Sequence, residues 1–262
     1  MVKVGQLNSK DFPANKKYAI PLSITGASNY SLIPSQRSAI LLLNRSILSS
    51  VAKVSGGEGI RIKPVGMHTK AEWTIQMSAI YSSLTRSNLT TAYLSNGTGG
   101  EFYTRISSTA GIQVKNGRDG DDTWTQMPLQ AGKWLHITYV HKDKKTTVYV
   151  NGKVQKVFEN SAITFGENSM IVVGNSGYRN DYLREIRLWD KALTESEIND
   201  YLYLPMDPAT PHLISYLPLS KEMETKDLKA PAGTENVTTK ARIEYVENVK
   251  FPADELVIVN QE

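Results

Sequence analysis

Two polar loops of the sequence carry an aromatic ring beside amide and carboxylate groups. Trp124 follows the polar segment 116–122 and belongs to no apolar strand face, so we expect its ring to be exposed and its replacement by alanine to leave stability almost unchanged. An exposed ring can stack on the C–H groups of a sugar while nearby amides and acids bond its hydroxyls. The residues predicted to bind such a ligand are Trp124, Tyr178, Tyr103, Asn175, Asn180 and Asp181. Ordinary exposed aromatics, which are common on protein surfaces, are the alternative interpretation.

The first of these loops also contains acids at the spacing of metal ligands. Asp119, Asp121 and Asp122 supply carboxylate oxygens, and Ca²⁺ accepts six to eight oxygens. A Gly-rich turn whose acids face water is the favoured interpretation, because acids two residues apart are ordinary there. Calcium is therefore a candidate ligand of this loop and the solvated turn is its alternative.

Catalytic chemistry has no recognisable residues in the sequence. The chain has no cysteine, which excludes thiolate nucleophiles and disulfides, and no G-x-S-x-G motif. The nearest group of acids is Glu222, Glu224 and Asp227, which we expect to be solvated in a polar loop. His136 follows Trp134 by two residues, so both should lie on one strand face with a structural role. The sequence predicts that the protein is not an enzyme.

Composition and charge restrict the possible partners. The net charge is +4 and 40% of the residues are hydrophobic, as in ordinary globular domains. Basic residues are scattered, and the densest run, residues 141–145, contains an acid and is interpreted as a solvated turn. A nucleic-acid partner is therefore not expected. No apolar run approaches the roughly 20 residues of a membrane span, and no signal peptide is recognisable, so an exported protein would appear here in trimmed form.

The elements that would position these residues are mostly strands. Apolar residues alternate at Tyr18–Ile24 and Trp73–Tyr81, and Asn151-Gly152 separates two strands of a three-stranded meander over residues 134–158. Thr194 and Glu197 form a capping box that begins a short helix, which Pro205 should end. Further strands are expected at residues 38–43, 170–173, 182–189, 212–217, 241–246 and 256–259. This density of short strands predicts an all-β antiparallel sandwich.

Two ordered motifs resemble a known family. The segments Gly132-Lys133-Trp134-Leu135-His136-Ile137-Thr138-Tyr139 and Val148-Tyr149-Val150-Asn151-Gly152-Lys153 resemble the central hairpins of laminin G-like domains in the concanavalin A-like lectin/glucanase superfamily. Residues 183–198 are similar to the family's closing strand and short helix, and residues 17–22 to the end of a domain of unknown function that precedes such domains in surface lipoproteins of Gram-negative bacteria.

The resemblance implies a fold, a domain organisation and a function. It implies a concanavalin A-like jelly roll at residues 49–262, with one short helix, and N-terminal edge strands at residues 1–48 from a partial or truncated domain. It further implies a non-catalytic lectin that binds an oligosaccharide or glycan at the outer-membrane surface, outside the cell, with contact to the membrane only through a lipid anchor absent from this chain. The paired acids by which glucanases of this fold cleave sugars are not found. A protein-interaction or assembly module that binds a neighbouring surface protein is the alternative, and a divergent glycoside hydrolase is a third class.

Overall fold

A computed structural model of the chain describes residues 18–26, 29, 31, 33, 35, 37–43, 46–57, 59–68, 70–95, 97, 102–115, 120–174 and 178–260. They form two compact units, residues 1–47 and 48–262. In the first unit, β1 (Tyr18–Ser23) and β2 (Ser38–Leu43) pair with each other in an antiparallel sheet of their own. No helix in the described ranges is long and apolar enough to cross a membrane.

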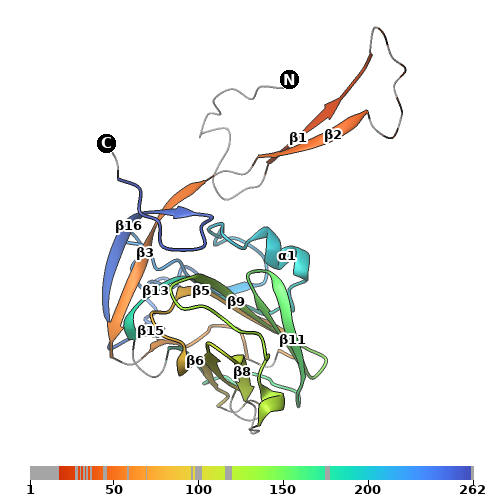
Figure 1. Ribbon diagram of the computed structural model, residues 1–262. Coiled ribbons are helices and arrows are strands. Elements are labelled where there is room, and N and C mark those ends of the chain that lie inside the picture. The colour runs from red at the N-terminus through yellow and green to blue at the C-terminus, as the bar shows by residue number, and fades with distance from the viewer. Residues whose placement is uncertain are drawn as a thin grey trace. The chain divides into compact units, whose positions relative to one another are not determined.

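The second unit is an antiparallel sandwich of two sheets (Figure 1). The eight-stranded sheet contains, in order, β11 (Lys153–Glu159), β10 (Lys145–Val150), β9 (Trp134–Lys142), β5 (Trp73–Ile80), β13 (Tyr178–Trp189), β3 (Ile47–Gly56) and β16 (Arg242–Phe251), and β14 (Leu213–Leu217) also pairs with β13. The six-stranded sheet contains β15 (Val237–Thr238), β4 (Ile60–Ile62), β12 (Met170–Val173), β6 (Thr85–Tyr93), β7 (Phe102–Ser107) and β8 (Gly111–Lys115). The predicted all-β concanavalin A-like jelly roll is confirmed.

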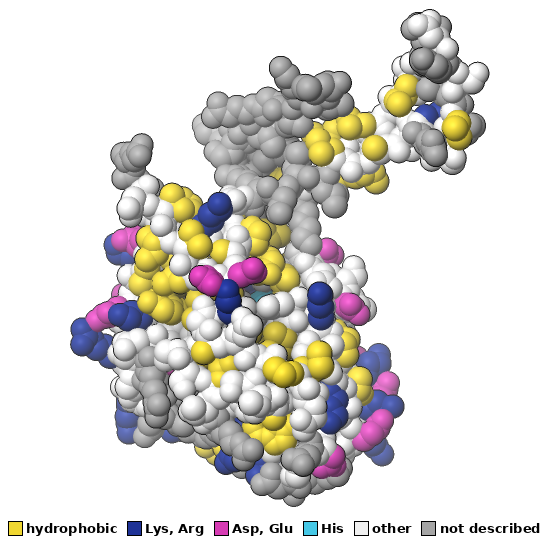
Figure 2. Space-filling view, in the orientation of Figure 1, with side chains coloured by type: hydrophobic (Ala, Val, Ile, Leu, Met, Phe, Trp, Pro, Cys, Tyr) yellow, Lys and Arg dark blue, Asp and Glu magenta, His cyan; other side chains and the backbone are white. Residues whose placement is uncertain are grey.

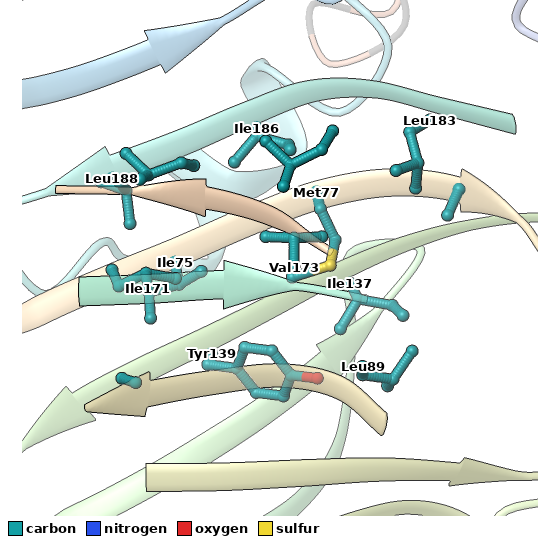
Figure 3. Close-up of a cluster of buried hydrophobic side chains, with 14 of the residues drawn as sticks. Ile75, Met77, Leu89, Ile137, Tyr139, Ile171, Val173, Leu183, Ile186 and Leu188 are labelled. Carbon is teal, nitrogen blue, oxygen red and sulfur yellow. The ribbon is translucent and has the colours of Figure 1, made fainter. Parts of the chain in front are cut away.

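The core lies between the two sheets. Figure 3 shows Met77 and Ile137 of the eight-stranded sheet and Leu89 and Val173 of the six-stranded sheet pointing into the space between them, and all four are fully buried. Trp73 and Trp189 are both buried, and Trp189 packs on the outer side of its sheet with residues around the helix. Interdigitated apolar side chains of this kind supply most of the stability of a sandwich.

The local predictions about turns and caps are largely correct. The strands β9, β10 and β11 form the expected meander, and Asn151 and Gly152 both have positive φ, as a type I′ turn requires. The helix α1 (Glu195–Asp200) begins with the Thr194 capping box. It ends at Asp200, so Pro205 does not end it as predicted.

A buried charge cluster lies at an irregularity in β13. The pairing of β13 with β5 shifts between Arg184 and Arg187, and Glu185, inside this bulge, has a φ of 56°. The extra residue places both arginines on the same outer face of the sheet. Arg187, which is fully buried, donates to Glu185 Oε2 from Nε at 3.1 Å and from Nη2 at 2.5 Å. It also donates to the carbonyl oxygens of Tyr201 at 3.0 Å and Leu204 at 2.5 Å.

The cluster fixes the segment after α1 to the sheet. Glu185 also accepts from the Tyr216 hydroxyl, 3.1 Å from each carboxylate oxygen. The guanidinium carbon of Arg184 lies 3.9 Å from the centre of the Phe251 ring. Burial lowers the pKa of Arg184, and the charge of Glu185 opposes that shift. Buried charges are costly unless they are paired, so the four hydrogen bonds that Arg187 donates are needed for this packing.

The basic run 141–145 was predicted to be a solvated turn, but His141 is buried. Its side chain is 1% exposed and stacks on Trp73, with ring centres 5.1 Å apart. Its Nε2 accepts from the Ile163 N–H at 3.2 Å, so Nδ1 carries the proton of the neutral ring and bonds Thr146 Oγ1 at 3.1 Å. Burial lowers the pKa of His141 to about 4.

We expect the protein to lose stability as the pH falls from about 6.5 to about 4. In this window His141 is neutral in the folded state but protonated in the unfolded state, so the unfolded chain binds more protons and the free energy of unfolding decreases by up to about 3 kcal/mol. Urea unfolding at a series of pH values measures the slope. His141→Asn should reduce it, whereas His68→Gln, at an exposed position, should not. Equal slopes in the wild type and His141→Asn would contradict the assignment.

Candidate functional site

The outer face of the six-stranded sheet presents two tyrosines. Ala92, Phe102 and Val173 point into the core, so by strand alternation their neighbours Tyr93 and Tyr103 point outward. Tyr93 is 38% exposed and Tyr103 is half-buried. We call this surface the tyrosine face.

A single row of residues crosses the tyrosine face. The pairing registers connect, strand by strand, Arg61, Val172, Thr91, Tyr103 and Lys115. Because neighbouring strands are about 4.8 Å apart, the row extends for roughly 19 Å. Tyr93 lies two residues beyond Thr91 on β6, which places it diagonally opposite Tyr103 at about 7–8 Å. Both rings therefore lie on the same face of the sheet, although Thr91 and Val172 of the row are only 1% exposed.

Arg105 holds the ring of Tyr103 in place. Its Nε donates to the Tyr103 hydroxyl at 2.9 Å, and its guanidinium carbon lies 5.2 Å from the centre of that ring. The two residues are alternate positions of β7 and therefore share the outer face. A cation beside an ordered ring combines a stacking surface with a hydrogen-bond donor.

Trp124 lies on the same face but is not exposed. It forms an antiparallel bridge with Gln113, which pairs with Arg105, so all three side chains are on one side of the sheet. Trp124 is only 5% exposed. The expectation of an exposed ring was wrong, because the segment after Asp122 runs along β8 as an extra strand instead of projecting as a loop. Trp124 and Tyr103, both predicted from the sequence as ligand-binding residues, lie on one face of the sheet.

A pocket of about 480 Å³ lies at the edge of the sandwich, between β8 and β11. We call it the edge pocket. It is lined by Val114, Asp122, Thr123, Lys156, Val157, Phe158, Glu159, Asn160 and Ser161. Lys156 crosses it, donating from Nζ to the carbonyl oxygens of Asp122 at 2.8 Å and Trp124 at 2.6 Å. The Oδ1 atom of Asn160 is buried and accepts no hydrogen bond from the described residues.

The predicted calcium ligands are only partly described. Asp119 lies outside the described residues, as does the side chain of Asp121, and Asp122 is exposed. No cluster of three metal-ligating side chains occurs in the described ranges. The Lys156 ammonium donates hydrogen bonds to two carbonyl oxygens of the loop, and its charge would repel a second cation nearby. The described part of the loop does not fit Ca²⁺, and the prediction still depends on the acids that are not described.

The second predicted loop is divided between strand and undescribed residues. Asn175 lies outside the described residues, as does the side chain of Tyr178, and β13 already begins at Tyr178 rather than after the loop. Asn180 is exposed with a φ of 61°. Asp181 is 7% exposed and accepts from Ser82, from its N–H at 2.8 Å and its hydroxyl at 3.0 Å. Its carboxylate thus connects β13 to the segment after β5 and has a structural role.

Asp227 is a further correction, because it is buried and not solvated. Its carboxylate accepts from Ser215 Oγ at 2.6 Å, the Tyr216 N–H at 2.8 Å, Asn236 Nδ2 at 2.8 Å and the Lys229 N–H at 3.0 Å. These bonds tie the segment after β14 to that strand. Glu222 and Glu224 are exposed, as expected. The three acids do not form a catalytic pair in one cleft.

A protein-family comparison covers more than half of the chain. Residues 55–199 match the model described as the concanavalin A-like lectin/glucanases superfamily. The chain belongs to this superfamily. The match includes every strand that forms the tyrosine face except β15. It shows nothing about the predicted N-terminal domain of unknown function or a lipoprotein context.

Three solved structures are similar to this chain to different degrees. A "putative carbohydrate binding protein" from Bacteroides ovatus matches with a TM-score of 0.60 and 18% identity, covering 94% of this chain and 72% of the other. A heptameric SAP-like pentraxin from Limulus polyphemus has a TM-score of 0.48 and 12% identity, covering 76% and 94%. A sialidase from Trypanosoma rangeli has a TM-score of 0.43 and 15% identity, covering 57% and 26%. No curated protein sequence matches.

Several residues of the tyrosine face were not identified from the sequence. We identified Tyr103 but not Tyr93, Arg61, Arg105 or Lys115, because no strand was predicted at residues 44–72 or 82–133. The alternation of Phe102, Thr104 and Ile106, all buried, is the signal that could have located β7.

Proposed function

We propose that this protein is a non-catalytic carbohydrate-binding protein and that the tyrosine face binds the glycan. The observation that carries the proposal is the pair of outward tyrosines, Tyr93 and Tyr103, on one sheet surface with the Arg105 guanidinium beside them. Aromatic rings offer stacking surfaces to sugars, and guanidinium donors bind hydroxyl oxygens. The fold and the name of the Bacteroides ovatus protein support the same function.

The edge pocket is less suited to stacking. Its ring, Phe158, is 7% exposed, and the Lys156 ammonium lies 5.0 Å from the ring centre. A sugar would have to displace Lys156 from two carbonyl oxygens before it could reach that ring. The tyrosine face needs no such rearrangement, because Tyr93 is already accessible.

Replacement of the tyrosines tests the site. We expect Tyr93→Ala and Tyr103→Ala each to weaken binding of the best glycan from an array by roughly 5- to 30-fold, the usual effect of one aromatic anchor. Isothermal titration calorimetry measures the change. Asn160→Ala, which alters only the edge pocket, should leave affinity unchanged. Loss of binding in Asn160→Ala, with both tyrosine variants unaffected, would move the site to the edge pocket.

The same purified protein distinguishes the other function classes. Capture of a neighbouring surface protein with no glycan bound would favour an assembly module. Reproducible hydrolysis of a glycan would favour a divergent glycoside hydrolase. Hydrolysis is not expected, because Asp227 is bonded within the fold and Glu222 and Glu224 are exposed to solvent.

Location and metal dependence complete the proposal. We propose a place on the outer surface of a Gram-negative cell, through a lipid anchor, on the basis of the resemblance of residues 17–22 to the end of a lipoprotein domain. Protease treatment of intact cells, followed by immunoblotting, tests this location, since only a surface protein is digested.

Titration of glycan in EDTA and in Ca²⁺ tests whether glycan binding requires calcium, and equal affinities would exclude a calcium requirement.

A further inference from the structure

The outer face of the eight-stranded sheet carries two neighbouring cross-strand rows of buried polar side chains. In the first row, Gln76 of β5 lies between Thr138 of β9 and Arg187 of β13. Gln76 donates to Thr138 Oγ1 at 3.4 Å and accepts from Trp189 Nε1 at 2.8 Å. Arg187 donates the four hydrogen bonds described above. Each side chain of this row therefore has a partner, as buried polar groups require.

The second row lacks such partners. It contains Ser78 of β5 between His136 of β9 and Arg184 of β13. The Ser78 hydroxyl lies 2.5 Å from His136 Nδ1, but His136 Nε2 and both Nε and Nη2 of Arg184 are buried without a hydrogen-bond partner among the described residues. Trp134, two residues before His136 and hence on the same face, has an unpartnered indole Nε1 there as well. Four buried nitrogen atoms on three neighbouring residues thus lack a partner, which is costly.

The charge around Arg184 is not balanced. Its Nη2 lies 3.6 Å from Glu185 Oε1, which is too long for a hydrogen bond, and the same carboxylate already pairs with Arg187. Burial, and further the charges of Arg187 and Arg184, lower the pKa of His136 well below its usual value, so this ring is neutral at pH 7. Two guanidinium groups therefore share one carboxylate. The surface differs, because Figure 2 shows basic and acidic side chains beside one another along the flanks of the second unit.

The second row is covered, with space beside its middle residue. The centre of the Phe251 ring lies 5.0 Å from that of Trp134 and 3.9 Å from the guanidinium carbon of Arg184. Ser78 has a short side chain between two long ones, and it is 7% exposed, whereas His136 and Arg184 are each 2% exposed. Accessible surface on so enclosed a residue means that space for a particle the size of a water molecule adjoins it.

We propose that Arg184, His136 and Trp134 bind a small inorganic anion of the size of chloride, at a place that we call the Arg184 site. The anion accepts hydrogen bonds from Nε and Nη2 of Arg184 and from the Trp134 indole. Ser78 donates to His136 Nδ1, which leaves the proton of the neutral ring on Nε2 as a further donor. A water molecule accepts only two hydrogen bonds and leaves the positive charge uncompensated, whereas an anion satisfies both needs.

The Arg184 site has a structural role that is independent of glycan binding, because the tyrosine face belongs to the other sheet. Phe251 follows from β16 and contacts Arg184, and the Tyr203 carbonyl oxygen accepts from Arg184 Nη1 at 3.5 Å. An anion that orders Arg184 therefore holds two separate segments of the chain on the outer face of the sheet.

Urea unfolding of the wild type in halide-free buffer tests the site. Chloride or bromide replaces gluconate, an anion too large for the enclosed site, at constant ionic strength. We expect the equilibrium constant for unfolding to fall about tenfold for each tenfold rise in chloride above the Kd, as for one ligand that binds only the folded state. Crystals grown in bromide should show an anomalous peak within hydrogen-bonding distance of Arg184, His136 and Trp134.

Two tryptophan variants provide a matched comparison. Trp134→Phe removes the unpartnered indole N–H, whereas Trp189→Phe removes one that already donates to Gln76. Both rings are buried on the outer side of the same sheet. We expect Trp134→Phe to weaken the apparent affinity for chloride roughly tenfold or more, the effect of one hydrogen bond to a charged group, and Trp189→Phe to keep the wild-type affinity. This readout is the chloride dependence within each variant, so the stability that either variant loses does not enter it.

Three results would overturn the inference. One is equal stability of the wild type in chloride, bromide and gluconate. Another is the same chloride affinity in Trp134→Phe as in Trp189→Phe. The third is a bromide-grown crystal in which a water molecule, with no anomalous peak, bonds Arg184 and His136.

Discussion

Replacement of Arg187 by alanine should lower the free energy of unfolding by about 3–5 kcal/mol, the usual cost of removing one partner of a buried ion pair. The Glu185 carboxylate would keep the Tyr216 hydroxyl but lose both bonds from Arg187. The carbonyl oxygens of Tyr201 and Leu204 would also lose their donor. Urea denaturation of the variant measures the change.

An exposed pair of the same kind provides the control. Arg242 and Glu244 are also two residues apart on one strand and form an ion pair, but the Arg242 side chain is 77% exposed. Arg242→Ala should therefore cost less than about 1 kcal/mol. A loss below 1 kcal/mol in Arg187→Ala as well would mean that the segment after α1 is held by its apolar contacts alone.

Replacement of Trp124 by alanine should cost about 3–5 kcal/mol of stability, as for other buried large aromatics. The ring packs on the outer side of the six-stranded sheet, and its removal would leave a cavity beside β8. Differential scanning calorimetry and urea denaturation measure the loss. The prediction reverses the one made from sequence, in which an exposed ring was expected.

Tyr93 is the comparison for Trp124. It lies on the same face but is 38% exposed, so Tyr93→Ala should cost about 1 kcal/mol or less. If Trp124→Ala leaves stability unchanged and abolishes glycan binding, Trp124 is itself a ligand contact and its burial does not describe the free protein in solution.

Local signals predicted the parts of the fold that depend on local physics. Asn151-Gly152 predicts the β10–β11 hairpin because only certain residues accept two positive φ angles. The capping box predicts the start of α1, since Thr194 and Glu197 bond each other's N–H groups. Trp73 was predicted to be buried because it lies on a strand whose alternate residues are apolar.

Residues whose burial depends on contacts between different elements could not be placed. The burial of Asp227 depends on Ser215 and Asn236, and that of Trp124 on a bridge to Gln113 in another strand. Arg184 and Arg187 share one face only because of the bulge at Glu185, and nothing in the period-two pattern predicts a bulge there. The candidate site was incomplete because the alternation of Phe102, Thr104 and Ile106 was not recognised as a strand.

The central strand β13 has consequences for the order in which the chain can fold. It pairs with β5 along one edge, and along the other edge first with β3, through Leu183 and Ala52, and then with β14, through Ile186 and Leu217. Contacts between such distant residues require large loops to close before any pairing energy is gained, which slows folding. During synthesis, the second edge of β13 therefore remains incomplete until residues 213–217 have left the ribosome, and the partly made sandwich must remain soluble until then.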